Sequence, residues 1–118
     1  MSNTFFGVAI DCSDAAVVAQ FWAEVLDRQV ADHPTRANAV VLVDDEGVHG
    51  PRLAFHQVPE PKTVKNRLHF DLITKDYEGE TERLISLGAT KIRDIDEGGG
   101  RWTTFGDVED NEFDLIAG

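Results

Sequence analysis

The side chains of this chain that are best suited to chemistry are one cysteine and four histidines. Cys12 cannot form a disulfide within the chain, and CxxC zinc or redox motifs are excluded, because there is no second cysteine. A nucleophilic thiol would need an adjacent base, which the sequence does not offer, so Cys12 is expected to be a small buried apolar group. His33 and His49 fall in predicted loops and are given no role.

A glycine run and a basic cluster are the next candidates for ligand binding. Gly98-Gly99-Gly100-Arg101 lacks the lysine and the serine or threonine of a phosphate-binding loop, so we expect a hairpin turn there. Lys62, Lys65 and Arg67 form the only basic cluster. Two interpretations of this cluster stay open: it solvates its segment or pairs with nearby acids, or it draws an anionic ligand toward a binding site.

Composition limits the partners of the chain. Its 118 residues predict one domain, and 22 acidic against 11 basic residues give a net charge of −11. This charge repels phosphate backbones and anionic lipid headgroups, so neither nucleic acid nor a membrane surface is an expected partner. No apolar run approaches the ~20 residues of a membrane span, and no charged leader precedes an apolar stretch. We therefore expect a cytoplasmic globular domain.

The elements that must position these side chains follow from hydrophobic periodicity. Residues alternating in polarity predict strands, and apolar residues at three- and four-residue intervals predict helices. In the first half we expect a helix at 15–26 and strands at 5–12, 29–32, 38–43 and 52–58. In the second half we expect a helix at 77–87, capped by Gly88, and strands at 68–74, 91–95, 102–105 and 112–116.

The two halves repeat one pattern. Residues 8–14 and 70–76 share strand phase and an aspartate before the following helix. Proline at positions 59 and 61 interrupts strand pairing between the halves, because proline has no amide hydrogen to donate. We therefore predict a single domain over 1–118, made of two βαβββ modules at about 3–58 and 67–118 joined by a connector at 59–66.

Three motifs resemble the vicinal oxygen chelate superfamily, which comprises glyoxalases, bleomycin-resistance proteins and extradiol dioxygenases, and in particular its small bacterial glyoxalase-like domain proteins. Residues 107–113 (DVEDNEF) are similar to the D-P-E-G-N-x-F turn of that family, and residues 58–71 and 87–90 carry the other matches. The resemblance implies an α+β fold in which two βαβββ modules form a cup-shaped mixed β-sheet. Val108 and Asp110 replace the usual proline and glycine, which predicts an altered turn at Asp110.

The resemblance also implies a metal site, because the superfamily binds a divalent ion at the bottom of the cup. Carried over by strand phase, the ligand positions fall on Gly7, His56, His69 and Asp114. Gly7 has no side chain, so one ligand is missing. The remaining two imidazoles and one carboxylate would suit Fe²⁺, Mn²⁺, Zn²⁺ or Ni²⁺ with positions open for substrate oxygens. Glu112 would act as a catalytic base or as a substitute ligand.

Each of these assignments has a structural alternative. His69 is also typical of a hydrogen-bonded strand residue, and a register slip of one residue would turn His56 outward. Asp114 is also compatible with a solvated or pocket-lining carboxylate. The resemblance implies further pocket-lining residues, which are Gly7, Ala9, Asp71 and Trp102.

Two functions of different classes follow from the resemblance. The first is a metal-dependent lyase, isomerase or dioxygenase-type enzyme that acts on a small oxygenated molecule; glyoxalase I itself is not expected, since its four-ligand set cannot be filled with Gly7 in place. The second is a metal-free protein that binds or sequesters a small molecule, as bleomycin-resistance proteins do, and a scaffold-like domain with a degenerate pocket is a third possibility. A homodimer is expected, with or without exchange of modules between its chains.

Overall fold

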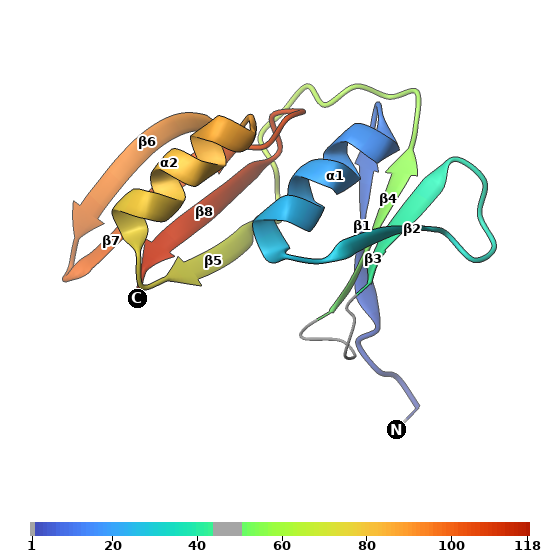
Figure 1. Cartoon of the computed structure of the whole chain (residues 1–118), viewed down its shortest axis with the longest axis horizontal. Coiled ribbons are helices and arrows are strands. Elements are labelled where there is room, and N and C mark those ends of the chain that lie inside the picture. The colour runs from blue at the N-terminus through green and yellow to red at the C-terminus, as the bar shows by residue number, and fades with distance from the viewer. Residues whose placement is uncertain (1, 44–50) are drawn as a thin grey trace. The chain divides into compact units, whose positions relative to one another are not determined.

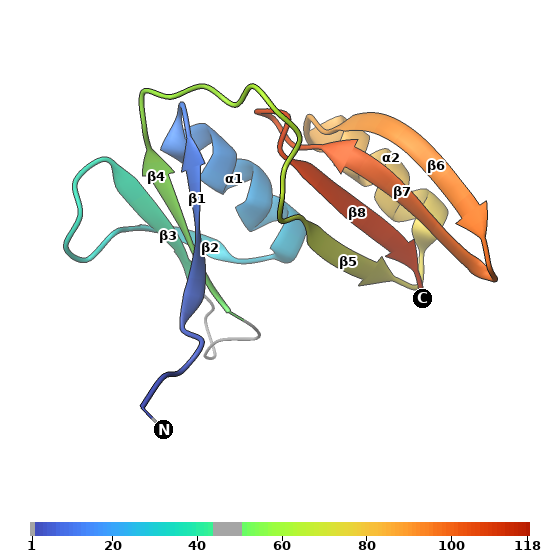
Figure 2. The same cartoon turned by 180° about the vertical axis from the view of Figure 1, so that it is seen from behind.

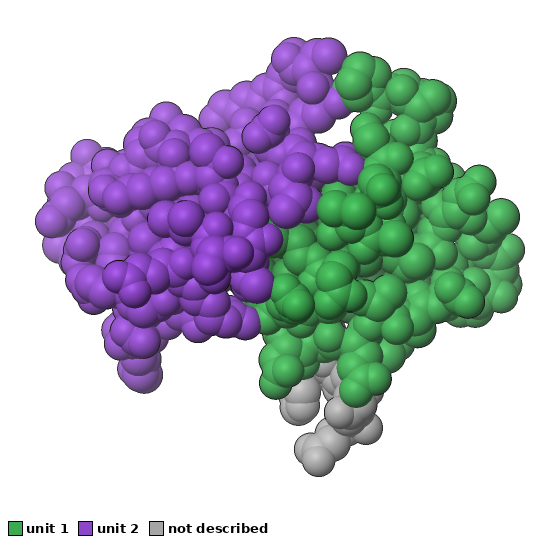
Figure 3. Space-filling view, turned by 45° about the horizontal axis from the view of Figure 1, so that its top comes forward, with its two compact units in different colours: residues 1–61 green, residues 62–118 purple. Residues whose placement is uncertain are grey.

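The computed structural model describes residues 2–43 and 51–118. The chain divides into two compact units, residues 1–61 and residues 62–118 (Figure 3). The division falls inside the predicted connector at 59–66. His49 lies outside the described residues.

The first unit is a four-stranded mixed sheet with one helix packed on it (Figure 1). The sheet has the order β1-β4-β3-β2, with β1 parallel to β4 and the other pairs antiparallel. Its elements are β1 (Gly7–Cys12), α1 (Ala15–Leu26), β2 (Gln29–Asp32), β3 (Ala39–Val43) and β4 (Arg52–Gln57).

The second unit repeats this order of elements (Figure 2). Its sheet has the order β5-β8-β7-β6, and β5 is again parallel to the strand that ends the unit. Its elements are β5 (Phe70–Thr74), α2 (Tyr77–Leu87), β6 (Thr90–Glu97), β7 (Gly100–Gly106) and β8 (Glu112–Ala117). The predicted α+β fold class with two βαβββ modules is therefore confirmed.

Two predicted strands begin later than expected. The strand predicted at 5–12 begins at Gly7, and the strand predicted at 68–74 begins at Phe70. The second difference has a simple cause: β5 pairs only with β8, and Phe70 is the first residue that finds a partner there, in Phe113. Leu68 consequently has an exposed fraction of 85%, although its alternation with Phe70 predicted a place in the strand.

Each helix begins at an aspartate whose carboxylate caps it. Asp14 Oδ1 accepts a hydrogen bond from the backbone N–H of Val17 at 3.2 Å, and Asp76 Oδ1 accepts one from Gly79 at 3.2 Å. Both caps satisfy amides that the first helical turn leaves without an acceptor. The aspartates that the sequence repeats before each helix therefore have a structural role in both units.

Strand alternation gives each sheet one apolar, helix-covered face and one face that carries polar side chains. In the second unit, the stacked rings of Phe105 and Phe113 lie 5.5 Å apart and are fully buried. Thr104 precedes Phe105 and Asp114 follows Phe113, so the side chains of Thr104 and Asp114 point to the opposite face. Chemistry in either unit must therefore be sought on the face away from its helix.

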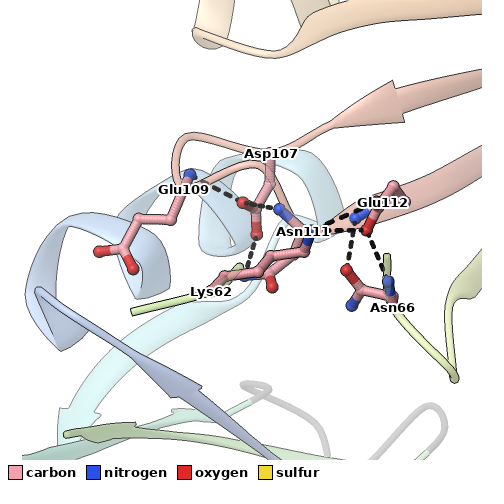
Figure 4. A network of polar contacts seen from close by, with 6 residues as sticks. All are labelled: Lys62, Asn66, Asp107, Glu109, Asn111 and Glu112. Atoms are coloured by element: carbon pink, nitrogen blue, oxygen red, sulfur yellow. Dashed lines mark hydrogen bonds and ion pairs between the residues drawn. The ribbon is translucent and has the colours of Figure 1, made fainter. Parts of the chain in front are cut away.

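The turn between β7 and β8 departs from the family pattern as the sequence predicts. Asp110 has φ 66°, in the left-handed region that glycine adopts most easily. The buried Asp107 carboxylate holds this turn, because its Oδ1 accepts hydrogen bonds from the backbone N–H groups of Glu109 at 2.8 Å and Asn111 at 3.0 Å (Figure 4). The aspartate in the glycine position therefore adopts the left-handed conformation, as an altered turn at Asp110 requires.

We expect Gly88→Ala to lower the free energy of unfolding by about 1–2 kcal/mol, the approximate cost of a left-handed conformation for an L-residue. Gly88 ends α2 with φ 115°, and a Cβ there would lie 3.0 Å from Val108 Cγ1. Gly98→Ala is the matched control, because Gly98 has φ 61° and no atom within 4 Å of an added Cβ. Urea unfolding should show a larger loss for Gly88→Ala; equal losses would show that the Val108 contact contributes nothing.

Candidate functional site

Three side chains with metal-binding atoms converge on the polar face of the second sheet. His69 Nδ1 lies 3.1 Å from Asp71 Oδ1 and 3.6 Å from Asp114 Oδ2. The three donor atoms all lie within 4.8 Å of one another. His69 comes directly before β5, Asp71 is in β5 and Asp114 is in β8, so the parallel pairing of these strands brings them together.

The chemistry of this donor set fits a divalent ion. One imidazole nitrogen and two carboxylate oxygens suit Zn²⁺, Mn²⁺ or Fe²⁺, and donor atoms that share an ion at bonds of about 2.1 Å lie roughly 3–3.6 Å apart. The side chains of His69, Asp71 and Asp114 have exposed fractions of 40%, 54% and 16%, so the group opens to solvent on one side. An ion held here would keep coordination positions for a ligand.

Asp114 is held by a neighbouring hydroxyl. Thr104 lies opposite it on β7, and its Oγ1 donates a hydrogen bond to Asp114 Oδ1 at 2.6 Å. Since this bond occupies Oδ1, Oδ2 is the oxygen that faces His69. Orientation of a ligating carboxylate by a second hydrogen bond is common in metal sites.

Sequence reasoning assigned Asp71 to the pocket lining and did not single out Thr104. The signal for Asp71 is its phase, because Asp71 in β5 pairs with Asp114 in β8. Thr104 carries no such signal, since only the antiparallel register of β7 and β8 brings it opposite Asp114. Trp102, also predicted to line the pocket, lies two residues before Thr104 and therefore on the same sheet face.

His56 belongs to the other unit and has different neighbours. It lines a hollow of about 200 Å³ on the polar face of the first sheet, and its Nδ1 lies 4.0 Å from Asp11 Oδ1. Gly7 and Ala9 of β1, which the resemblance placed in the pocket, line the same hollow. The metal role of His56 stays a prediction, because His56 belongs to the first unit, whereas His69 and Asp114 belong to the second.

Gly7 has no room for a ligand side chain. A Cβ added there would lie 2.5 Å from the carbonyl oxygen of Arg52 on the paired strand β4. Because that oxygen is a backbone atom, a side chain could enter only if β1 and β4 moved apart. The missing ligand of the first strand is therefore fixed by backbone packing as well as by residue type.

Glu112, predicted as a catalytic base, is already engaged (Figure 4). Its carboxylate accepts hydrogen bonds from Lys62 Nζ at 3.3 Å and from the backbone N–H of Asn66 at 3.1 Å, and Asn66 Oδ1 accepts one from the N–H of Glu112 at 3.2 Å. Burial alone would raise the pKa of this carboxyl, but the hydrogen bonds from Asn66, from the Glu112 amide and from Lys62 outweigh it and lower the pKa. This arrangement favours a structural role, anchoring the residues after Pro61 to β8.

Comparison with known proteins agrees with this fold. A glyoxalase/bleomycin resistance/dioxygenase family enzyme from Burkholderia phytofirmans PsJN matches with 20% identity, TM-score 0.74 and coverage of 98% of both chains. The fosfomycin resistance protein FosX from Listeria monocytogenes matches with 15% identity and TM-score 0.77 over 100% of this chain and 95% of that one. A FosX variant determined with Mn(II) and 1S,2S-dihydroxypropylphosphonic acid matches with 15% identity and TM-score 0.78 over 100% and 91% of the two chains.

These structures define the fold class, which is that of glyoxalase/bleomycin resistance/dioxygenase proteins. The family within this class follows from the sequence, because residues 7–116 match the family model of a glyoxalase-like domain. The chain belongs to the glyoxalase-like domain family, as its motifs predict. No match to a curated protein was found. Within the described residues, neither helix is long and apolar enough to cross a membrane.

We expect Glu112→Gln to lower the free energy of unfolding at pH 7 by about 1.5–3 kcal/mol, the usual range for hydrogen bonds to a charged group. Because the folded state lowers the pKa of Glu112 below its ordinary value of 4.5, its stabilisation is complete above that value and is lost as the pH falls through the folded pKa. Urea unfolding from pH 7 to pH 3 should therefore show the wild type converging on Glu112→Gln. Glu97 is an exposed glutamate on β6, so Glu97→Gln is the control. An equal loss of unfolding free energy in Glu97→Gln would contradict the role of Glu112.

Proposed function

We propose that this protein is a divalent-metal-dependent enzyme of the glyoxalase-like class that acts on a small oxygenated molecule. The observation that carries the proposal is the convergence of His69, Asp71 and Asp114 on one open sheet face. His69 and Asp114 are also the positions at which the family resemblance implies metal ligands. The Mn(II) bound by a FosX variant of the same fold supports a divalent ion as the cofactor.

The residues of the proposed metal site would have different roles. His69 and Asp114 would hold the ion, with Asp71 as a third ligand, and a bound ion would supply a Lewis acid that polarises a carbonyl or another substrate oxygen. Thr104 would keep the Asp114 carboxylate turned toward His69. Trp102, on the same sheet face, would provide an apolar wall against the substrate. Glu112 would not serve as the base, because hydrogen bonds occupy its carboxylate.

Elemental analysis of tag-free protein, loaded in turn with Mn²⁺, Fe²⁺, Zn²⁺ and Ni²⁺, tests this proposal directly. We expect near-stoichiometric metal in the wild type and none in His69→Ala or Asp114→Asn, because each change removes a ligand. Thr104→Val should retain the site but weaken its affinity about 10–100-fold, as loss of an orienting hydrogen bond does.

Asp96→Asn is the matched control for this experiment, since it removes the same charge from an exposed position on β6. Metal that persists in His69→Ala, or that is lost equally in Asp96→Asn, would contradict the assignment. His56→Ala decides whether the imidazole of the first unit adds a ligand: a loss of affinity would support the set implied by the family resemblance.

A metal-free binding protein is the second candidate, and the packing at Gly7 favours it. Because a Cβ at Gly7 would meet the Arg52 carbonyl oxygen at 2.5 Å, the fourth ligand of the superfamily's metal site cannot be supplied there. An apolar ligand would then be held on one of the polar sheet faces, against Trp102 in the second unit or against Phe6 beside the hollow in the first.

Tryptophan fluorescence separates this second candidate from the first. Trp22 is fully buried and Trp102 is half-buried, so a bound aromatic probe such as 4-nitrophenol should quench Trp102. For a metal-free binding protein we expect saturable quenching that EDTA does not change and that Trp102→Phe removes. Quenching that requires added metal would count against it.

A homodimer and a cytoplasmic location complete the proposal. Both stay predictions from the sequence and its family resemblance.

A further inference from the structure

The hollow of the first unit gathers three cationic or potentially cationic side chains over a floor of small residues. Gly7, Ala9 and Ala54 leave the space open, since none carries more than a methyl group. Arg52, His33 and His56 line the same hollow. The rings of His33 and His56 lie 5.9 Å apart. In a chain of net charge −11, such a concentration of positive groups needs a physical reason.

His33 has hydrogen-bond donors facing both of its ring nitrogens. Nδ1 accepts hydrogen bonds from the backbone N–H groups of Thr35 at 3.2 Å and Arg36 at 3.0 Å. Nε2 lies 3.0 Å from Nη2 of Arg52, and a guanidinium nitrogen can only donate. A neutral imidazole carries one hydrogen, on one of its two nitrogens. Because both nitrogens of His33 face donors, the protonated nitrogen must direct its N–H toward another donor.

The two backbone amides decide where that hydrogen lies. Because both amides point at Nδ1, that nitrogen must be the acceptor, and the hydrogen belongs on Nε2. Nε2–H and the Arg52 guanidinium are therefore two donors that meet without an acceptor.

Arg52 has no carboxylate to supply that acceptor among the described residues. Within residues 2–43 and 51–118, the guanidinium pairs with His33 and lies over the ring of Phe6, whose centroid is 5.0 Å away. Asp11 lies near the cluster, with its Oδ1 4.0 Å from His56 Nδ1, but its side chain has an exposed fraction of 70%. An incoming oxyanion would satisfy both donors at once.

We propose that this hollow binds the oxyanion of a small, partly apolar molecule, with an oxygen accepting hydrogen bonds from His33 Nε2 and Arg52. The ligand class is a carboxylate, phosphate or phosphonate. A cavity of about 150 Å³ accommodates benzene, so the roughly 200 Å³ here suits a head group with a ring-sized apolar part. Phe6 and Ala54 supply the apolar contacts for that part. The hollow lies in the first unit and includes Gly7, Ala9 and His56, which the resemblance places in the pocket, and oxyanion binding by His33 and Arg52 goes beyond the metal-dependent function proposed above.

The test is a titration of metal-free, tag-free protein with benzoate, inorganic phosphate and the neutral benzamide, followed by NMR of the histidine rings. Before titration we expect His33 protonated at Nε2 and not at Nδ1. Benzoate and phosphate should shift the His33 ring resonances saturably, whereas benzamide should not, because it lacks the charge. Arg52→Met should weaken benzoate binding about 10–100-fold, as loss of a charge-assisted hydrogen bond does.

A second variant keeps the test informative if Arg52→Met unfolds. His33→Asn retains an oxygen that can accept from the two backbone amides but removes the Nε2 donor, so we expect it to fold and to bind benzoate more weakly. Lys75→Met is the matched control, because it removes one positive charge from an exposed residue of the second unit. It should retain the wild-type affinity.

The proposal would be overturned by no saturable binding of either anion, by a proton on Nδ1 of His33, or by equal weakening in Lys75→Met and Arg52→Met. Binding that appears only with Mn²⁺ and is lost in His69→Ala would also overturn it, and would place the anion at the metal centre instead. Failure of the metal assignment leaves this test unaffected, since the titration uses metal-free protein.

Discussion

The parallel pairing of β5 with β8 is the interaction on which the candidate metal centre depends. It sets Asp71 directly opposite Asp114 and, one residue earlier, Phe70 opposite Phe113. Burial of Phe113 against the helix side of the sheet fixes this register, because a slip of one residue would exchange the apolar and polar faces of the strand. The hydrophobic core of the second unit thus holds two carboxylates together that would otherwise repel each other. A cation, either His69 or a metal ion, is the natural counterpart of that pair.

The first unit has the same construction but carries different chemistry. Its parallel pair, β1 and β4, sets Gly7 opposite Arg52 and Asp11 opposite His56. Close approach of the Arg52 carbonyl keeps position 7 free of a side chain, and this opens the hollow that His33, Arg52 and His56 line. One repeated scaffold therefore presents an acidic, metal-compatible face in the second unit and a cationic, anion-compatible face in the first. Function in this fold depends on the side chains of the polar sheet faces, while the apolar faces maintain the architecture.

The turn and the connector show how a family motif can serve structure. Asp107 uses its buried carboxylate to hold the turn before β8, and Glu112 ties Lys62 and Asn66 to the start of that strand. A carboxylate that accepts several hydrogen bonds is stabilised in its ionised form and becomes a weaker base. Glu112 lies two residues before the candidate metal ligand Asp114, and its hydrogen bonds favour the role of an anchor over that of a base.

The sequence by itself determined the order of elements, both helix starts at Asp14 and Asp76, and the duplicated βαβββ pattern, because these depend on local periodicity and capping. It also singled out His69 and Asp114 through their family positions. Only the tertiary structure decided which side chains meet: Asp71 and Thr104 join Asp114 through strand pairing, and His33, assigned no role in the sequence, comes within 3.0 Å of Arg52. Such contacts depend on register between strands that are distant in the sequence, and local patterns carry no information about that register.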